Sequence, residues 1–340
     1  MKPLARLGGF KILKDVVRIS LASHKQTRDL PAKLCRLIAE KEINLPYINY
    51  VNDGQSWGLN IVVGSSKGRR ISDLIEENFG KIFHHNSKSA ILSIFPHKRN
   101  PEITGSLFEA FSQVGVEPDA LANSPSAISA VLEEESLNKA SDSLFGAFKF
   151  SAYRTPADWK MAQKGKEQLY REVVASYQEK RPRVYGLEYQ ERQEFFHIKL
   201  NRRHIGRFGA TLKKFARLGL HLTFLATGPC DEKGKEKLVI CLPAPKNHTY
   251  TEIISGITPE GGMDCLPSVA TFSLNGPHFG DRYGIASELL HALKESHIDL
   301  LALNCTIASI IGVLPSDQIE PAIQAIRGCF DVPSIIKKEN

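Results

Sequence analysis

The sequence lacks the features that would place the chain in a membrane, secreted or disulfide-rich class. No uninterrupted apolar run is long enough to cross a bilayer, and the first residues are basic without the apolar core of a signal peptide. The six cysteines are scattered, with no Cys-x-x-Cys pair among them. We therefore expect buried thiols in a cytoplasmic protein that has no membrane partner.

Motifs that carry chemistry are missing as well. The sequence contains no G-x-x-x-x-G-K-[ST] stretch and no G-x-G-x-x-G after a predicted strand. Among the eleven histidines, His84 and His85 are adjacent but have no cysteine or carboxylate at metal-ligand spacing. No Ser-His-Asp or Cys-His set can be assembled from the spacing. The sequence therefore predicts no catalytic residue, no metal and no cofactor.

The charge distribution is more informative than the net charge. A net charge of +7 over 340 residues favours anionic partners without indicating nucleic acid. Residues 195–229 contain no acidic side chain, and Arg202, Arg203, His204 and Arg207 crowd a predicted loop and helix start. These four side chains predict an anion site, while Phe208 and Phe215 are better explained as core. We therefore expect no nucleic-acid partner.

A hydrophobic pattern recurs four times along the chain. In its second copy, a strand-like run at residues 90–95 precedes a helical stripe of Ile103, Leu107 and Phe111. Two short alternating runs follow, joined by a turn at residues 123–125, and a second helical stripe ends the copy. The order strand, helix, strand, strand, helix, strand is that of a split βαβ, or ferredoxin-like, unit.

The other copies have the same order. The first copy contains a helix around Leu34 and an Asp53-Gly54 turn, which is a strong hairpin signal. The third and fourth copies contain helices around Leu212 and Leu289, and first strands lie about seventy-five residues apart within each pair. We predict units at residues 1–85, 86–154, 194–266 and 267–340, with a linker helix and lead-in at residues 155–193.

The order and pairing of these copies resemble the tandem regulatory ACT domains of aspartokinases. The stretches GSLFEAFSQVGVEPDALANSPSAISAVL and YGIASELLHALKESHIDLLALN are similar to the second ACT unit of that family, and AKLCRLIAEKEINLPYI to the first. The resemblance implies an α+β protein of four ferredoxin-like βαββαβ units, arranged as two tandem pairs with side-by-side antiparallel sheets. It also implies a free amino acid bound between paired units.

The resemblance does not extend to a nucleotide-binding domain. Aspartokinases open on a strand with a Lys-Phe-Gly-Gly motif, and the nearest match here is Gly8-Gly9, which we interpret as a turn. We therefore predict that the chain is not an enzyme. We expect a non-catalytic regulatory protein that senses an amino acid of the lysine or threonine type. The alternative is a regulatory or scaffolding subunit that docks on a separate aspartokinase or other biosynthetic enzyme. The sequence leaves open whether the chain forms a homodimer.

The resemblance places the ligand at the loop that follows each first strand. A helix N-terminus there can take the α-carboxylate, and an acidic or amide side chain can take the ammonium. The family's helix-start glycine falls on Asp29 and Glu102 in the first two copies, where an acid would compete with the ligand carboxylate. It is kept as Gly206 and Gly284 in the last two copies.

Two loops therefore hold the candidate ligand-binding residues. In the fourth copy they are Asn275, His278, Asp281, Arg282 and Gly284, together with Asn304, which aligns with an interface position of the family. A solvated loop in which Asp281 caps its own helix explains the same residues. In the third copy they are Arg202, Arg203, His204 and Gly206.

Overall fold

The computed structural model describes residues 4–23, 29–80, 84–163, 181–229, 235–244, 250, 253–254, 263–276, 279, 282–306 and 309–339. Residues 164–180 of the predicted linker lie outside the described residues, as do His278 and Asp281. Within the described residues, none of the helices is both long and apolar enough to cross a membrane.

Strands and helices alternate in an order that repeats along the chain. In the first half, the elements are β1 (Ala5–Leu7), β2 (Gly9–Ser23), α1 (Leu30–Glu40), β3 (Tyr47–Asn52), β4 (Trp57–Gly64), α2 (Gly68–Phe79), β5 (His84–Phe95), α3 (Pro101–Gln113), β6 (Ala120–Asn123), β7 (Ile128–Glu133), α4 (Leu137–Ala147), β8 (Phe148–Phe150) and α5 (Pro156–Gln163). In the second half, they are β9 (Gly186–Asn201), α7 (Ile205–Arg217), β10 (Phe224–Pro229), β11 (Lys235–Pro243), β12 (Met263–Asn275), α9 (Ile285–Glu295), β13 (Ala302–Cys305), β14 (Ser309–Pro315), α10 (Ile319–Cys329) and β15 (Ile335–Lys337). The α+β class predicted from the sequence is confirmed.

Local sequence explains where the helices begin and which face they bury. Asn100 caps α3 by accepting a hydrogen bond from the Glu102 backbone N–H at 2.9 Å, and Pro101 occupies the first turn. In α1 the buried side chains include Leu30, Leu34 and Ile38, at the spacing of one helical face.

The main sheet closes on itself. Its strands run in the order β11-β10-β6-β7-β5-β2-β4-β3-β13-β14-β12-β9, and β9 pairs back with β11. The short strand β15 adds to the start of β9, and β1 pairs separately with β8. Closure leaves no free edge along most of the sheet.

Repeats distant in sequence lie side by side. β3 pairs with β13, where Asn49 lies opposite Asn304, and β6 meets β10 at Ala122 and Ala226. The first repeat thus sits beside the fourth, and the second beside the third. Consecutive repeats are joined through the long strands, β2 with β5 and β9 with β12.

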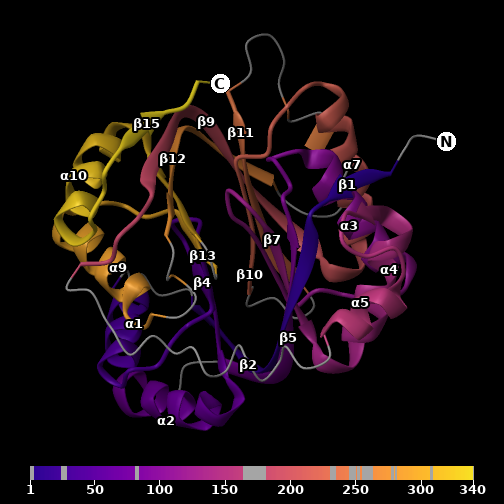
Figure 1. The fold of residues 1–340 in the computed structure, drawn as a ribbon. Helices are drawn as coiled ribbons and strands as arrows, with labels where there is room; N and C mark the ends of the chain where they lie inside the picture. Colours follow the sequence, from indigo (N-terminus) through magenta and orange to yellow (C-terminus); the bar gives the residue numbers. More distant parts are fainter. Residues whose placement is uncertain are drawn as a thin grey trace.

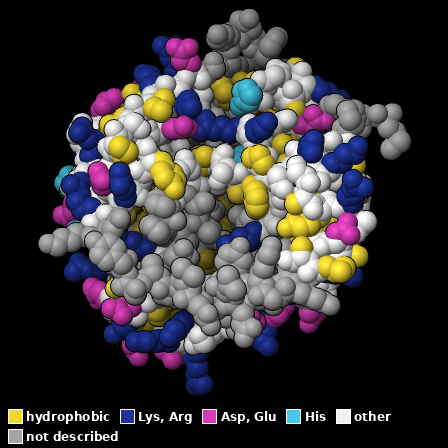
Figure 2. All heavy atoms as spheres, viewed as in Figure 1, with side chains coloured by type: hydrophobic (Ala, Val, Ile, Leu, Met, Phe, Trp, Pro, Cys, Tyr) yellow, Lys and Arg dark blue, Asp and Glu magenta, His cyan; other side chains and the backbone are white. Residues whose placement is uncertain are grey.

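The flattened sheet forms two layers with helices outside them. Figure 1 shows α1, α2, α9 and α10 against one layer and α3, α4, α5 and α7 against the other. One large apolar core lies under each helix layer, and smaller cores that include Val51, Phe224 and Ile311 fill the space between the sheets. Figure 2 shows Lys and Arg side chains spread around the periphery of one face, with acidic side chains among them.

Candidate functional site

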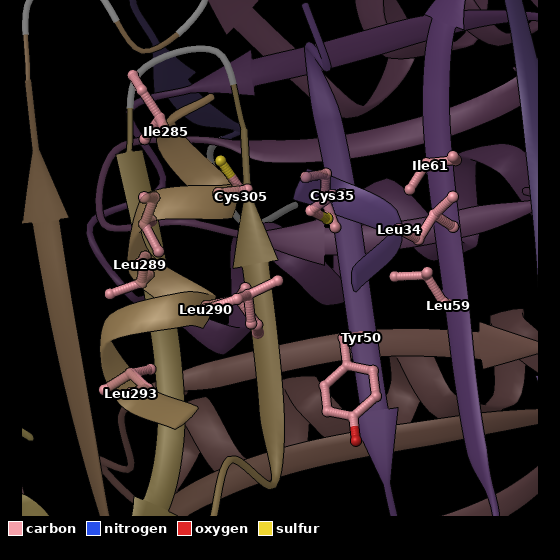
Figure 3. Packing of buried hydrophobic residues seen from close by; sticks show 14 of the residues in the cluster. Leu34, Cys35, Tyr50, Leu59, Ile61, Ile285, Leu289, Leu290, Leu293 and Cys305 are labelled. Carbon is pink, nitrogen blue, oxygen red and sulfur yellow. The ribbon is translucent and has the colours of Figure 1, made fainter. Parts of the chain in front are cut away.

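The helices α1 and α9 lie side by side over the β3–β13 pair. Both helices have eleven residues, and each precedes the strand that forms the pair. Because equivalent strands pair antiparallel, the first and fourth repeats are related by an approximate two-fold axis. Figure 3 shows this layer, with Leu289, Leu290 and Leu293 on α9, Leu34 and Cys35 on α1, and Tyr50 on β3. One cavity lies on each side of the axis.

The larger cavity has a volume of about 490 Å³ and lies between the start of α1 and the end of α9. Its polar lining includes Asp29 at the start of α1, Tyr50 and Asn52 on β3, and Lys294, His297 and Asp299 at and beyond the end of α9. This volume is within the range of small-molecule sites.

The charges around the larger cavity are mixed. The Lys294 ammonium lies 3.1 Å from an Asp29 carboxylate oxygen, and both side chains are partly exposed. The backbone N–H of Asp299 donates to Gln318 Oε1 at 2.7 Å, which holds the segment after α9 against α10. A zwitterion could place its carboxylate near Lys294 and the N-terminus of α1, and its ammonium near Asp29 or Asp299.

The smaller cavity, of about 10 Å³, occupies the equivalent position across the axis and has room for about one water molecule. Its lining includes Cys35, Ile38, Phe279, Arg282, Gly284 and Cys305. Burial raises the pKa of both thiols to about 12, so they stay protonated at neutral pH. The cavity is mostly apolar.

Of the fourth-loop candidates that the structure describes, Arg282 and Gly284 line this smaller cavity. Gly284 precedes α9 with φ of +86°, a left-handed conformation that glycine adopts without strain. Arg282 Nη2 donates to Glu288 Oε1 at 3.1 Å. Burial raises the pKa of Glu288, although Arg282 opposes the shift. Asn275 ends β12, and its carbonyl accepts from the Tyr185 N–H.

Asn304 is not brought together with these loop residues. It is fully buried between the two sheets, where its Nδ2 donates to the carbonyls of Asn123 and Leu225, both at 2.9 Å. Its neighbours Leu303 and Cys305 belong to the core under the helices, so Asn304 occupies the opposite face of β13.

The third-loop candidates lie where α7 packs against α3. A Cβ on Gly206 would lie 2.5 Å from Ser112 Oγ, so glycine here permits close helix packing. Arg203 Nε lies 3.7 Å from Glu117 Oε1 at the surface, and His204 occupies the N-cap position of α7 without a side-chain cap. Arg202 precedes them, and its side chain is outside the described atoms.

The sequence did not predict the larger cavity. Of its polar lining residues, only Asp29 was considered from the sequence, and it was expected to disfavour a ligand. Lys294, His297 and Asp299 belong to the fourth repeat, but they face the first-repeat loop. The available signal was the correspondence between the two repeats, in which Asp29 aligns with Gly284 and Lys294 with Ala39. That alignment becomes informative only once β3 is known to pair with β13.

No family model matches this sequence, and no curated protein matches it. Among solved structures, an aspartate kinase from Synechocystis matches with a TM-score of 0.77 and 16% identity, over 95% of this chain and 56% of that chain. Regulatory subunits of aspartate kinase from Thermus thermophilus and Thermus flavus match with TM-scores of 0.38 and 0.39 and identities of 13% and 14%. Each of these two matches covers 44% of this chain and 99% of the subunit. The first match shows an aspartokinase-like fold, and the chain spans 56% of that enzyme's length.

The prediction that the chain is not an enzyme is contradicted by this comparison, because 95% of the chain matches a protein that is an aspartate kinase. The accompanying statement that the family's kinase domain is absent is likewise unsupported. Both rested on missing short glycine-rich motifs. At 16% identity a fold persists while such motifs change, so their absence was weak evidence.

Proposed function

We propose that this chain is an amino-acid-responsive regulatory protein of the aspartokinase type. In this proposal the four repeats are ACT-type units bounded at residues 1–85, 86–154, 194–266 and 267–340, and the effector is a free amino acid of the lysine or threonine type. The observation that carries the proposal is the larger cavity between α1 and α9, where an ammonium and a helix N-terminus adjoin carboxylates.

The second and third repeats differ from this arrangement. A Cβ on Gly105 would lie 2.5 Å from the Gly209 carbonyl oxygen, and one on Gly209 would lie 2.7 Å from the Gly105 carbonyl oxygen. Helices α3 and α7 thus touch backbone to backbone. We assign the ligand to the first and fourth repeats and a structural role to the α3–α7 contact.

A thermal-shift panel of the twenty amino acids, followed by calorimetry, tests the proposal. Lys294→Gln and Asp29→Asn should each weaken binding about tenfold, because each removes one charged partner of the zwitterion. Arg36→Gln is the matched control, since it removes an exposed charge on α1 that pairs with Glu40 on the same helix. An absence of binding by every amino acid would contradict the proposal.

The surface of the fourth loop is a second proposed location for the ligand, because the smaller cavity itself has room for only about one water molecule. Arg282 and Gly284 line the smaller cavity, and the loop also carries Asn275, His278 and Asp281. Calorimetry on Asp281→Ala distinguishes the two locations, because unchanged affinity leaves the larger cavity as the site. Docking on a separate aspartokinase is the alternative role, and co-purification with such an enzyme would favour it.

The match to an aspartate kinase favours a second candidate function, the phosphorylation of aspartate. A coupled assay with ATP and aspartate tests it directly. Turnover above background would support this activity, and a flat trace with pure, folded protein would count against it.

A further inference from the structure

The two faces of β3 contact different parts of the molecule. Ile48 and Tyr50 belong to the core under the helices, and Tyr50 also lines the larger cavity. Tyr47 and Val51 belong to the small cores between the sheets. This alternation follows from the period of two in a strand. A single strand therefore contacts both the proposed ligand site and the opposite sheet.

The contacts on the opposite-sheet side of β3 are close. Asn49 Nδ2 donates to the carbonyls of Leu121, at 3.3 Å, and Thr227. A Cβ on Gly228 would lie 2.1 Å from Val51 Cγ2, so β10 reaches β3 because this position is glycine. β3 and β10 are therefore in direct contact across the two layers.

The turn after β3 (residues 53–56, the β3–β4 turn) is tied to the third repeat by an ion pair. Asp53 Oδ1 accepts from the backbone N–H groups of Gln55 at 3.0 Å and Ser56 at 2.7 Å. Asp53 Oδ2 lies 2.6 Å from Lys237 Nζ, on β11, and Lys237 also donates to the Ser56 carbonyl. The Lys237 side chain is only 7% exposed.

The electrostatics of the β3–β4 turn agree with this geometry. Burial raises the pKa of Asp53, but the hydrogen bond from Lys237 and those from the turn backbone outweigh burial and lower it overall. Asp53 is therefore ionised at neutral pH and forms a charge-assisted bond. Asn52, the residue before it, lines the larger cavity and accepts from the Gly54 N–H at 2.9 Å.

We propose that β3 and the β3–β4 turn form a coupling element, through which occupancy of the larger cavity and the position of the third repeat influence each other. The part concerning ligand rests on the proposed function. Coupling of this kind is reciprocal. Breaking the Asp53–Lys237 ion pair should therefore loosen the cavity walls even when no ligand is present.

Hydrogen exchange on the ligand-free full chain tests this expectation. Lys237→Met should accelerate exchange roughly tenfold in β3 and, across the cavity, at residues 290–300. Lys213→Met is the matched control, because it removes a partly buried ion pair to Glu109 that joins α3 to α7 without touching β3. Asp53→Asn, which keeps an acceptor for the turn, replaces Lys237→Met if that variant does not fold.

In the ligand-free arm, two results would overturn the proposal. One is acceleration confined to the β3–β4 turn and β11. The other is uniform acceleration that includes α4, which would indicate global destabilisation. A second arm adds L-lysine and L-threonine separately to the parent protein, and a ligand that binds in calorimetry should slow exchange in β11. Binding without any effect on β11 also contradicts coupling. An absence of calorimetric binding contradicts the proposed function instead, and the ligand-free arm still decides the coupling.

Discussion

Acidification from about pH 6.5 to pH 4 should destabilise this protein through its buried histidines. His97 is 1% exposed, and its Nε2 lies 2.6 Å from the Ser124 carbonyl oxygen, so the neutral ring donates there. Burial lowers the pKa of His97 from 6.5 to about 4, although the bond to Ser124 opposes the shift. Burial also lowers the pKa of His197 to about 4.

The magnitude follows from linkage. Between the two pKa values the unfolded chain holds one more proton on His97 than the folded chain does, so stability rises with pH over this range. The contribution is fully present above the unfolded value of about 6.5 and is lost as the pH falls toward the folded value near 4. A shift of this size corresponds to about 3 kcal/mol. His197, whose pKa is lowered to the same value, should contribute in the same direction.

Urea unfolding at a series of pH values from 7.5 down to 4.5 measures this contribution. His97→Gln keeps an N–H donor near Ser124 but does not titrate. It should reduce the slope of unfolding free energy near pH 5 by about 1.4 kcal/mol per pH unit. His291→Gln, at an exposed position on α9, is the matched control. Equal slopes for the parent and His97→Gln would refute the reasoning.

Three further predictions concern stability at neutral pH, measured by urea unfolding. Gly209→Ala should destabilise the protein by about 1–3 kcal/mol, because the added Cβ would meet the α3 backbone. Gly146→Ala, at a position with open space around it, should stabilise the protein by about 0.5 kcal/mol. Equal effects of the two substitutions would contradict the close contact between α3 and α7. Leu34→Ala should lower the free energy of unfolding by about 2–5 kcal/mol, since Leu34 is fully buried in the core under the helices. A loss below about 1 kcal/mol would contradict its place in that core. Asn304→Ala should lower the free energy of unfolding by about 2 kcal/mol, because it removes the donor to the buried carbonyls of Asn123 and Leu225. An unchanged stability would contradict the role of Asn304 in joining the two sheets.

The repeated elements could be predicted from the sequence because their signals are local. The stripe of Ile103, Leu107 and Phe111 specified α3, and the Asp53-Gly54 turn specified the hairpin of β3 and β4. A helix or hairpin is set by residues a few positions apart, so periodicity and turn chemistry are sufficient. The same reasoning supports the α+β class.

Missing motifs were a weaker guide to function than periodicity and turn residues were to secondary structure. The absence of glycine-rich phosphate motifs led to the prediction that the chain is not an enzyme, and the match to an aspartate kinase contradicts it. A short motif is one of several ways to contact a given ligand, whereas a fold depends on the burial pattern of the whole chain.

The sequence by itself determined the helices and strands of the four repeats and their order along the chain. Only the tertiary structure decided that β3 pairs with β13, that Lys294 faces Asp29 across a cavity, and that Asn304 points between the sheets. These outcomes depend on which strand edges meet and which side of a strand faces which layer. Strand edges from different repeats carry the same backbone groups, so the choice of partner comes from the packing of the whole chain and leaves no local pattern to read.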